Sequence, residues 1–190
     1  MVPVTITRRG FTTRALALAL GGYAAVDARA SASPGVGAPA SVTSDVSAAS
    51  YCPDGEEQAF LGLINQYRAN NGLGPVSNSA TLGAAAEQHS RDMAYHNYFS
   101  HTLFSGRSWL DNIRAMGYRF RTSTGENIAA GHSSAGETFT QWRNSPPHRA
   151  NTLNGAFTAI GIGRASNSRS RYRWYWTTTF GGVFDEGPRC

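Results

Sequence analysis

The fold is decided by two stretches near the carboxyl end of the chain, FTAIGIGR at residues 157–164 and YRWYWTTTF at residues 172–180. In the first stretch, Ile160 and Ile162 alternate with small residues. In the second, aromatic residues and a threonine recur at every second position, and a polar run over residues 166–170 separates the two stretches. Period-two alternation around a short polar loop predicts an antiparallel β-hairpin.

Helical spacing replaces this alternation in the preceding part of the chain. Apolar residues from Phe60 to Tyr67 recur three and four positions apart, after Asp54, which can cap a helix, and before Gly72 or Gly74, which can end one. Further helices are predicted over residues 79–96, over residues 107–116, and from Ser134 to the break at 144–148, with a helical turn following to Leu153.

A short strand is also predicted at Gly125–Ala130. Helices therefore dominate the first part of the domain, and an antiparallel hairpin closes it. This order predicts the α+β class. The glycine-rich stretch at residues 131–136 resembles the G-x-S-x-G elbow of hydrolases, but its second glycine comes one place late, so Ser133 or Ser134 is interpreted as a helix cap.

Arginine supplies all the basic charge of the chain. The 190 residues include 17 arginines, no lysine and 12 acidic residues, a net charge of +5. Residues 1–30 hold four of the arginines and one acid, so 13 arginines and 11 acids remain, a net charge of +2. No apolar run is long enough to span a membrane, and two cysteines are too few for a disulfide-dense miniprotein.

Residues 1–30 are typical of a bacterial export signal. Arg8 and Arg9 precede Phe11 and an apolar stretch over residues 15–26, and a small-residue A-x-A pattern ends at Ala30. This order resembles a twin-arginine signal peptide; an ordinary signal that carries two arginines is the alternative. Residues 31–51 are rich in Ser, Ala, Pro and Gly and predict a disordered linker. We therefore expect a folded domain at 52–190 that is secreted or periplasmic.

The two cysteines stand at the two ends of this domain. In an oxidising compartment we expect a Cys52–Cys190 disulfide, with two unpaired thiols as the alternative. Closing so long a loop stabilises a fold by roughly 4 to 5 kcal/mol in the chain-entropy model.

Histidines and one glutamate supply the candidate chemistry. His89 falls on the apolar face of a predicted helix and is interpreted as a core residue, and His96 closes that helix. His101 and His148 fall in or beside loops, and Glu126 lies at the edge of the short strand. Two imidazoles and a carboxylate are a known ligand set for a divalent cation such as Zn²⁺, and they can also act as general acid and base without metal.

Basic and aromatic residues interleave around the predicted hairpin. We interpret them as a solvated face above core aromatics; an anionic envelope polymer and single-stranded nucleic acid are the alternative partners. We expect no nucleic-acid partner for an exported protein. The residues concerned are Arg164, Arg169, Arg171, Tyr172, Arg173, Trp174 and Trp176.

Five motifs follow one another in the domain: FLGLINQYRAN at 60–70, FSHT at 99–102, GENIA at 125–129, WRNSPPHRAN at 142–151 and FTAIGIG at 157–163. In this order they resemble the CAP superfamily, also called SCP-like, which includes cysteine-rich secretory proteins, venom allergens and plant pathogenesis-related proteins. The resemblance covers about residues 57–184 and is closest to the bacterial branch. It implies a three-layer α-β-α sandwich, with an antiparallel sheet between helices, in an extracytoplasmic protein.

The resemblance also implies a cavity lined by histidines and glutamates, which holds a divalent metal in some members. Three residues of this chain match its positions: His101, Glu126 and His148. The second histidine and second glutamate of eukaryotic members fall near Ala156 and Ser145, and an acidic position common in bacterial members is Ala159. The fourth group of the cavity is therefore missing.

Two functions follow from these features. The first is a secreted, monomeric binding module for a lipid, a cell-wall component or a protein. The second is a metal-assisted hydrolase or peptidase, with His101, Glu126 and His148 around a metal-bound water. We favour binding, because no activated nucleophile is visible and Ala159 leaves the cavity incomplete. The fold alone does not decide between them.

Overall fold

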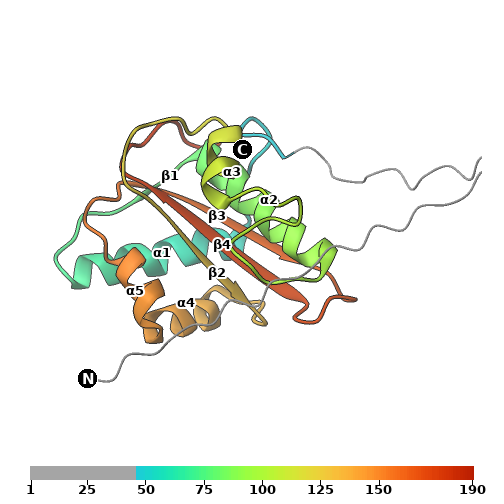
Figure 1. The fold of residues 1–190 in the computed structure, drawn as a ribbon. Helices are drawn as coiled ribbons and strands as arrows, with labels where there is room; N and C mark the ends of the chain where they lie inside the picture. Colours follow the sequence, from blue (N-terminus) through green and yellow to red (C-terminus); the bar gives the residue numbers. More distant parts are fainter. Residues whose placement is uncertain (1–45) are drawn as a thin grey trace, which may run out of the picture. The chain divides into compact units, whose positions relative to one another are not determined.

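A four-stranded sheet lies between two helical layers in the computed structural model, which describes residues 46–190 (Figure 1). Helices α2 and α3 cover one face of the sheet, while α1, α4 and α5 pack together on the other. This arrangement confirms the predicted α-β-α sandwich. The helices are α1 (Gly55–Asn70), α2 (Ala80–His96), α3 (Trp109–Ala115), α4 (Ala135–Asn144) and α5 (Pro146–Thr152). The strands are β1 (Ser77–Asn78), β2 (Thr124–Ala130), β3 (Ala159–Ser166) and β4 (Trp174–Gly181).

The order of strands in the sheet is β1-β3-β4-β2. Strands β3 and β4 form the predicted antiparallel hairpin, and β2 pairs antiparallel with β4. The two-residue β1, which is too short to show a periodic pattern, adds a parallel pair at the edge and makes the sheet mixed. Both hairpin strands begin two residues later than we predicted from Phe157 and Tyr172, and the second begins just after Arg173, whose φ is +65°.

Short polar side chains start the helices where the sequence predicts. The Asp54 carboxylate accepts a hydrogen bond from the Glu57 amide, and the Glu57 carboxylate accepts one from the Asp54 amide, which completes a capping box. Helix α1 ends at Asn70, slightly before the predicted Gly72. Ser134 caps α4, so the elbow-like stretch is a helix start, as we interpreted it. Residue bounds differ from the predictions by one or two positions at most other ends.

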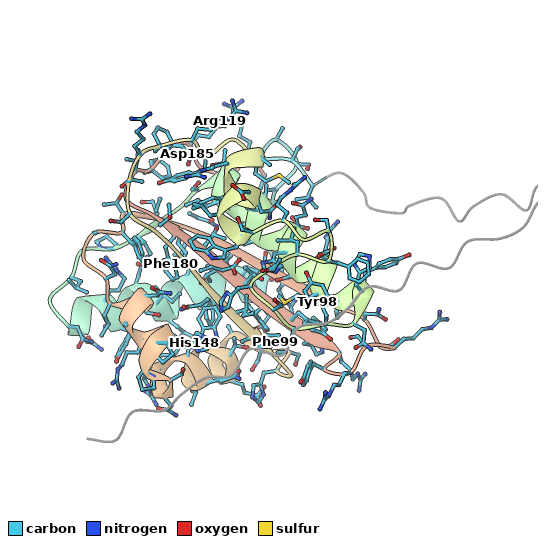
Figure 2. All side chains as sticks on the ribbon, in the orientation of Figure 1. Tyr98, Phe99, Arg119, His148, Phe180 and Asp185 are labelled. Carbon is cyan, nitrogen blue, oxygen red and sulfur yellow. A yellow bond between two sulfur atoms is a disulfide. The ribbon has the colours of Figure 1, made fainter. Side chains whose placement is uncertain are left out.

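Two apolar layers hold the sandwich together. One lies between the sheet and helices α1 and α4 and includes Phe60, Trp142, Trp176 and Phe180, which is labelled in Figure 2. The other lies under α2 and α3 and consists of Leu82, Ala85, Ile113, Tyr118 and Ala159. Ala159 is thus fully buried among apolar side chains.

Helix α2 approaches β3 so closely that only glycine fits beneath it. A Cβ atom on Gly161 would collide with the backbone of Leu82 and Gly83, and one on Gly163 with that of Glu87. These backbone atoms belong to the interior of a helix and cannot move aside as a flexible side chain could. The two glycines therefore set the distance at which α2 packs on the sheet.

Gly161→Ala should consequently lower the free energy of unfolding by about 3 kcal/mol, the upper end of the range for overpacked sites. Gly62→Ala is the matched control, because Gly62 lies in the exposed middle of α1 with nothing within 4 Å of a new Cβ. That substitution should raise stability by about 0.5 to 1 kcal/mol. Urea unfolding of both variants tests the close approach, and equal midpoints would contradict it.

A disulfide joins the ends of the described fold. Cys52 and Cys190 are bonded, with their Cα atoms 5.5 Å apart, as we predicted. Beside it, Tyr51 is buried, and its hydroxyl donates to the Ile162 carbonyl at 2.7 Å. The fold thus includes Tyr51, which we placed at the end of the linker. The signal peptide and residues 31–45 of the predicted linker lie outside the described residues.

Candidate functional site

Glu126 is the centre of the candidate site. It lies on β2, and its side chain is only 1% exposed. One carboxylate oxygen, Oε1, is 2.7 Å from Nδ1 of His101, and the other, Oε2, is 2.7 Å from Nδ1 of His89. Glu126 and His101, which we predicted from the sequence as site residues, are therefore in direct contact. Both oxygens of the carboxylate are used by histidines.

His89 is a core residue, as interpreted from its position on α2, but its contacts give it a second role. Its side chain is fully buried, and Nε2 is 3.0 Å from the Ser100 carbonyl oxygen. A carbonyl oxygen can only accept, so Nε2 carries a proton. The bond to Glu126 needs one further proton, held either by Nδ1 of His89 or by the carboxyl group. His89 thus fixes Glu126 from the side opposite His101.

His101 is the exposed member of this chain of hydrogen bonds. It follows α2 in a loop, and 53% of its side chain is accessible to solvent. The hydrogen bond to Glu126 raises the pKa of His101 above its ordinary value of 6.5, against a smaller opposing effect of partial burial. Because Nδ1 points to Glu126, Nε2 is the nitrogen that faces outward, and it makes no hydrogen bond to any of residues 46–190.

His148 stands at the start of α5 (Figure 2). The charge of His101 contributes to the pKa shift of His148, so the two side chains lie close enough for their charges to interact. Its ring packs against Trp142, with centroids 5.7 Å apart. Burial, and secondly the positive charge of His101, hold the pKa of His148 below 6.5. Nδ1 of His148 is buried and has no hydrogen-bond partner among the described residues. The structure thus brings His148 near the pair formed by His101 and Glu126.

Two asparagines hold α5 against β2 and so position His148. Asn127 donates from Nδ2 to the His148 carbonyl oxygen at 3.1 Å. Asn151 donates from Nδ2 to the Asn127 side-chain oxygen at 2.8 Å and to the Glu126 carbonyl oxygen at 3.1 Å. Both asparagines lie in motifs of the sequence, GENIA and WRNSPPHRAN, but the motifs alone did not indicate their role. The available signal was an asparagine next to Glu126 in a predicted strand, since a buried amide needs partners.

The two histidines should titrate in a fixed order. We expect the pKa of His101 above 6.5 and that of His148 below 6.5, because a carboxylate faces the first and burial beside a cation disfavours charge on the second. Two-dimensional NMR of the imidazole protons across a pH series measures both values. Glu126→Gln should return His101 toward its ordinary value, and the reverse order of the two titrations would contradict the geometry.

The side chains available do not form a ready metal centre. No group of three or more His, Cys, Asp or Glu residues within 46–190 is arranged to hold a metal ion. Both Glu126 oxygens are already bonded to histidines, and without Glu126 the site offers two imidazoles. Catalytic zinc usually has three protein ligands. As arranged, the candidate residues do not fit a resident metal. The metal expected from the sequence stays a prediction, which a metal titration tests.

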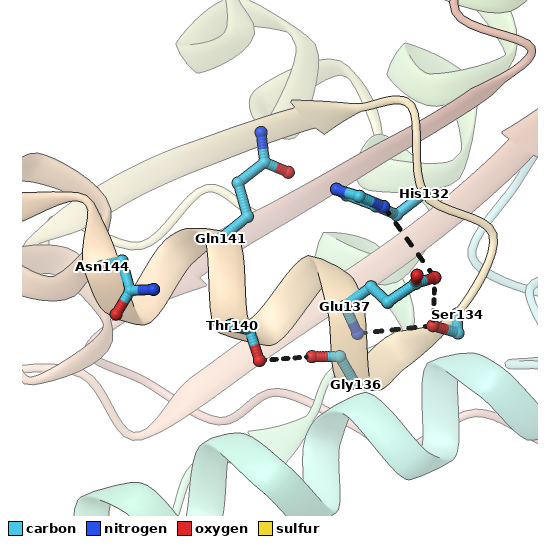
Figure 3. Close-up of a pocket in the computed structure, with 7 residues that line it drawn as sticks. All are labelled: His132, Ser134, Gly136, Glu137, Thr140, Gln141 and Asn144. Atoms are coloured by element: carbon cyan, nitrogen blue, oxygen red, sulfur yellow. Dashed lines mark hydrogen bonds and ion pairs between the residues drawn. The ribbon is translucent and has the colours of Figure 1, made fainter.

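A pocket of about 530 Å³ lies along α4 (Figure 3), and His101, Glu126 and His148 do not line it. His132, Ser134 and Glu137 line it, and the closest approach of the His132 ring nitrogen Nδ1 to the Glu137 carboxylate is 3.8 Å. The hydroxyl of Ser134 bonds to the Glu137 carboxylate as part of the α4 cap. No nucleophile is therefore activated there by a histidine.

The fold and the motif residues define the family. Residues 61–180 match the model of the cysteine-rich secretory protein family, CAP. Because this match spans more than half of the chain, the protein belongs to the cysteine-rich secretory protein family. No helix among the described residues has the length and apolar character needed to cross a membrane.

Three of the similar proteins come from bacteria. Protein YkwD of Bacillus subtilis is 38% identical over 107 residues, which is 56% of this chain and 41% of YkwD. The structure of an extracellular protein with an SCP domain from Bacillus anthracis is 32% identical with a TM-score of 0.60, over 68% of this chain and 41% of that one. An outer surface protein of Borrelia burgdorferi, 22% identical with a TM-score of 0.60 over 66% of this chain and 91% of that one, shares the fold.

The chain spans less than half the length of the two Bacillus proteins it matches. The similarity therefore covers the shared domain and does not extend to the remaining parts of those proteins. A role in binding or catalysis has to be argued from the residues of this chain.

Proposed function

We propose that this protein is an extracytoplasmic binding module whose ligand docks on His101 and His148. The observation that carries the proposal is the use of both Glu126 oxygens by His89 and His101. A carboxylate engaged in this way is less available to activate water or to hold a metal, because each of its oxygens is already bonded to a histidine. Its remaining role is to fix the His101 ring, with Nε2 presented to a ligand.

The charge of the site indicates the kind of group it would recognise. Because its pKa is raised, His101 is cationic over a wider pH range than an ordinary histidine. His148, whose pKa is lowered, is neutral over a wider pH range than an ordinary histidine. A cationic donor held by a buried carboxylate suits an anionic group such as a carboxylate. Preorganisation by Glu126 and the two asparagines lowers the entropy cost of binding.

Binding to purified peptidoglycan, freed of attached anionic polymers, tests this proposal, because its peptides carry free carboxylates. His101→Gln should weaken cosedimentation about tenfold, as expected when a charged hydrogen bond is lost. His132→Gln is the matched control, since that histidine is 44% exposed and lies outside the site. Equal binding by the two variants, or no binding by the unaltered protein, would overturn this ligand class.

A metal-assisted hydrolase is the second candidate. The observation in its favour is the buried Nδ1 of His148, which lacks a partner among the described residues. The two bonds to Glu126 oppose it, and we derive no step through a metal. Calorimetric titration with zinc decides the matter: tight binding at one equivalent that disappears in both His101→Ala and His148→Ala would favour this candidate over the first.

Export through residues 1–30 completes the proposal. The neighbours described as an extracellular protein and an outer surface protein support it, as does the Cys52–Cys190 disulfide, since such bonds persist in oxidising compartments. Changing Arg8 and Arg9 to lysine should block secretion if the signal is of the twin-arginine type. Continued secretion of that variant would instead indicate an ordinary signal.

A further inference from the structure

Three aromatic rings form an exposed platform at the end of α2. Tyr95 and His96 meet edge to face with centroids 4.9 Å apart, and His96 stacks on Phe104 with centroids 4.0 Å apart and planes inclined by 6°. Tyr95 is 62% exposed and Phe104 is 66% exposed. Large aromatic side chains that lie together in solvent are typical of interaction sites.

Asp92 holds this platform in place. One of its carboxylate oxygens, Oδ1, is 3.0 Å from Nδ1 of His96. The other, Oδ2, accepts hydrogen bonds from the Tyr98 hydroxyl at 2.5 Å and from the Phe104 amide at 2.8 Å. The loop after α2 is therefore tied back to the helix, and the platform is formed before any ligand arrives.

Beside the platform lies a cleft of about 1000 Å³ between α2, this loop and the β3–β4 hairpin. Arg91, Arg107 and Arg169 line it. Arg91 pairs with Glu87, whereas Arg107 and Arg169 have no acidic partner within residues 46–190. Among the described residues, Asp92 is the only acid that lines the cleft, and its carboxylate is already engaged by His96, the Tyr98 hydroxyl and the Phe104 amide.

The hairpin wall of the cleft is also fixed to α2. Asn167 donates from Nδ2 to the Ala94 carbonyl oxygen at 2.9 Å, and the Arg171 amide donates to the Asn97 side-chain oxygen at 2.7 Å. Asn97 caps α2 in the left-handed conformation, with φ of +55°. Two hydrogen bonds therefore tie the hairpin wall to the end of α2, the same helix that carries Tyr95 and His96.

We propose that this cleft binds an anionic polysaccharide. Tyr95 lines the cleft, and Phe104 lies beside it, stacked on His96. Their exposed ring faces suit the apolar faces of sugar rings. Arg107 and Arg169 suit carboxylates or phosphates carried by those sugars, since guanidinium groups bind such anions in pairs of hydrogen bonds. The arginines line a concave cleft, a shape that receives a polymer chain and not a flat membrane. None of these residues belongs to the site of His101, Glu126 and His148, so this site stands independently of the proposed function.

Calorimetry with four probes tests the assignment. Polygalacturonate carries a carboxylate on every sugar, dextran is a neutral sugar chain, polyphosphate is an anion without sugars, and phosphatidylglycerol vesicles offer an anionic membrane. We expect polygalacturonate to bind at least about tenfold more tightly than the other three. Equal or tighter binding of polyphosphate would reduce the cleft to a charged surface, and preference for vesicles would make it a membrane site; either result overturns the proposal.

Paired variants locate the binding. Tyr95→Ala with Phe104→Ala, and separately Arg107→Gln with Arg169→Gln, should each weaken polygalacturonate binding about tenfold. Arg119→Gln with Phe120→Ala is the matched control, because it removes an exposed arginine and an exposed aromatic ring outside the cleft. All six side chains are exposed, so the urea midpoint of each variant should match that of the unaltered protein. Unchanged affinity in the aromatic pair would overturn the stacking role, and hence the polysaccharide assignment.

Discussion

Glu126→Ala should lower the free energy of unfolding by about 3 kcal/mol, the upper end of the cost of leaving a buried hydrogen-bonding group without its partner. The carboxylate is 1% exposed and is bonded to two histidines. Without it, Nδ1 of His89 has no acceptor in a site that solvent does not reach. The bond from His89 to the Ser100 carbonyl remains, but it satisfies only one of the two ring nitrogens.

Two further variants separate the effect of losing this buried carboxylate on stability from the effect of losing any glutamate. Glu126→Gln keeps the shape and can accept one hydrogen bond, so we expect a smaller loss of about 1 to 3 kcal/mol. Glu186→Ala removes an exposed carboxylate whose side chain bonds only to Arg189 within the described residues, and should change stability by less than about 0.5 kcal/mol. Urea unfolding of the three proteins tests this order. Equal stability of Glu126→Ala and Glu186→Ala would mean that the pair is not buried as described.

Replacing Cys52 and Cys190 together by serine should cost about 4 to 5 kcal/mol in the chain-entropy model. The bond joins residues 138 positions apart, so it restricts nearly the whole folded domain in the unfolded state. Domains are typically stable by only about 5 to 15 kcal/mol, so the loss brings this one close to unfolding. The measurement is the urea midpoint of the double variant and of the reduced protein.

The controls use the same bond. Each single variant breaks it and should lose as much as the double variant, and reducing agent should have no further effect on any of them. If reduction left the midpoint of the unaltered protein unchanged, the contacts of Tyr51 and its neighbours would hold the ends together without the bond. Stability would then reside in the burial of Tyr51 under α2 and in its hydrogen bond to Ile162.

The hairpin and the long helices were predictable because each carries many repeats of one period. The two-residue β1 was not, since it owes its pairing to Thr158 and Ile160, whose carbonyl oxygens accept from Ser77 and Ser79. Strand periodicity also placed Ile160 and Ile162 on one face of β3. In the structure helices cover both faces of the sheet, so most of β3 is buried on each side. Local patterns therefore identified the elements but not every neighbour.

For the site, the sequence identified His101, Glu126 and His148 as candidates, and the structure brings them near one another. It did not connect His89 to Glu126, because that contact joins a helix to a strand 37 positions later and depends on how α2 packs. Glycines at 161 and 163 set this packing, and their effect is visible only in three dimensions. The same holds for the aromatic platform, whose rings come from α2 and from the loop beyond it.

The bond between Cys52 and Cys190 also decides how the domain bears mechanical load. A pull between these two positions travels through one pair of sulfur atoms and bypasses the 138 positions between them. The helices and the sheet then carry none of the applied force, so the force cannot separate the strands one after another from the ends of the domain. A domain built in this way keeps its fold intact under tension, for as long as that single covalent link is oxidised.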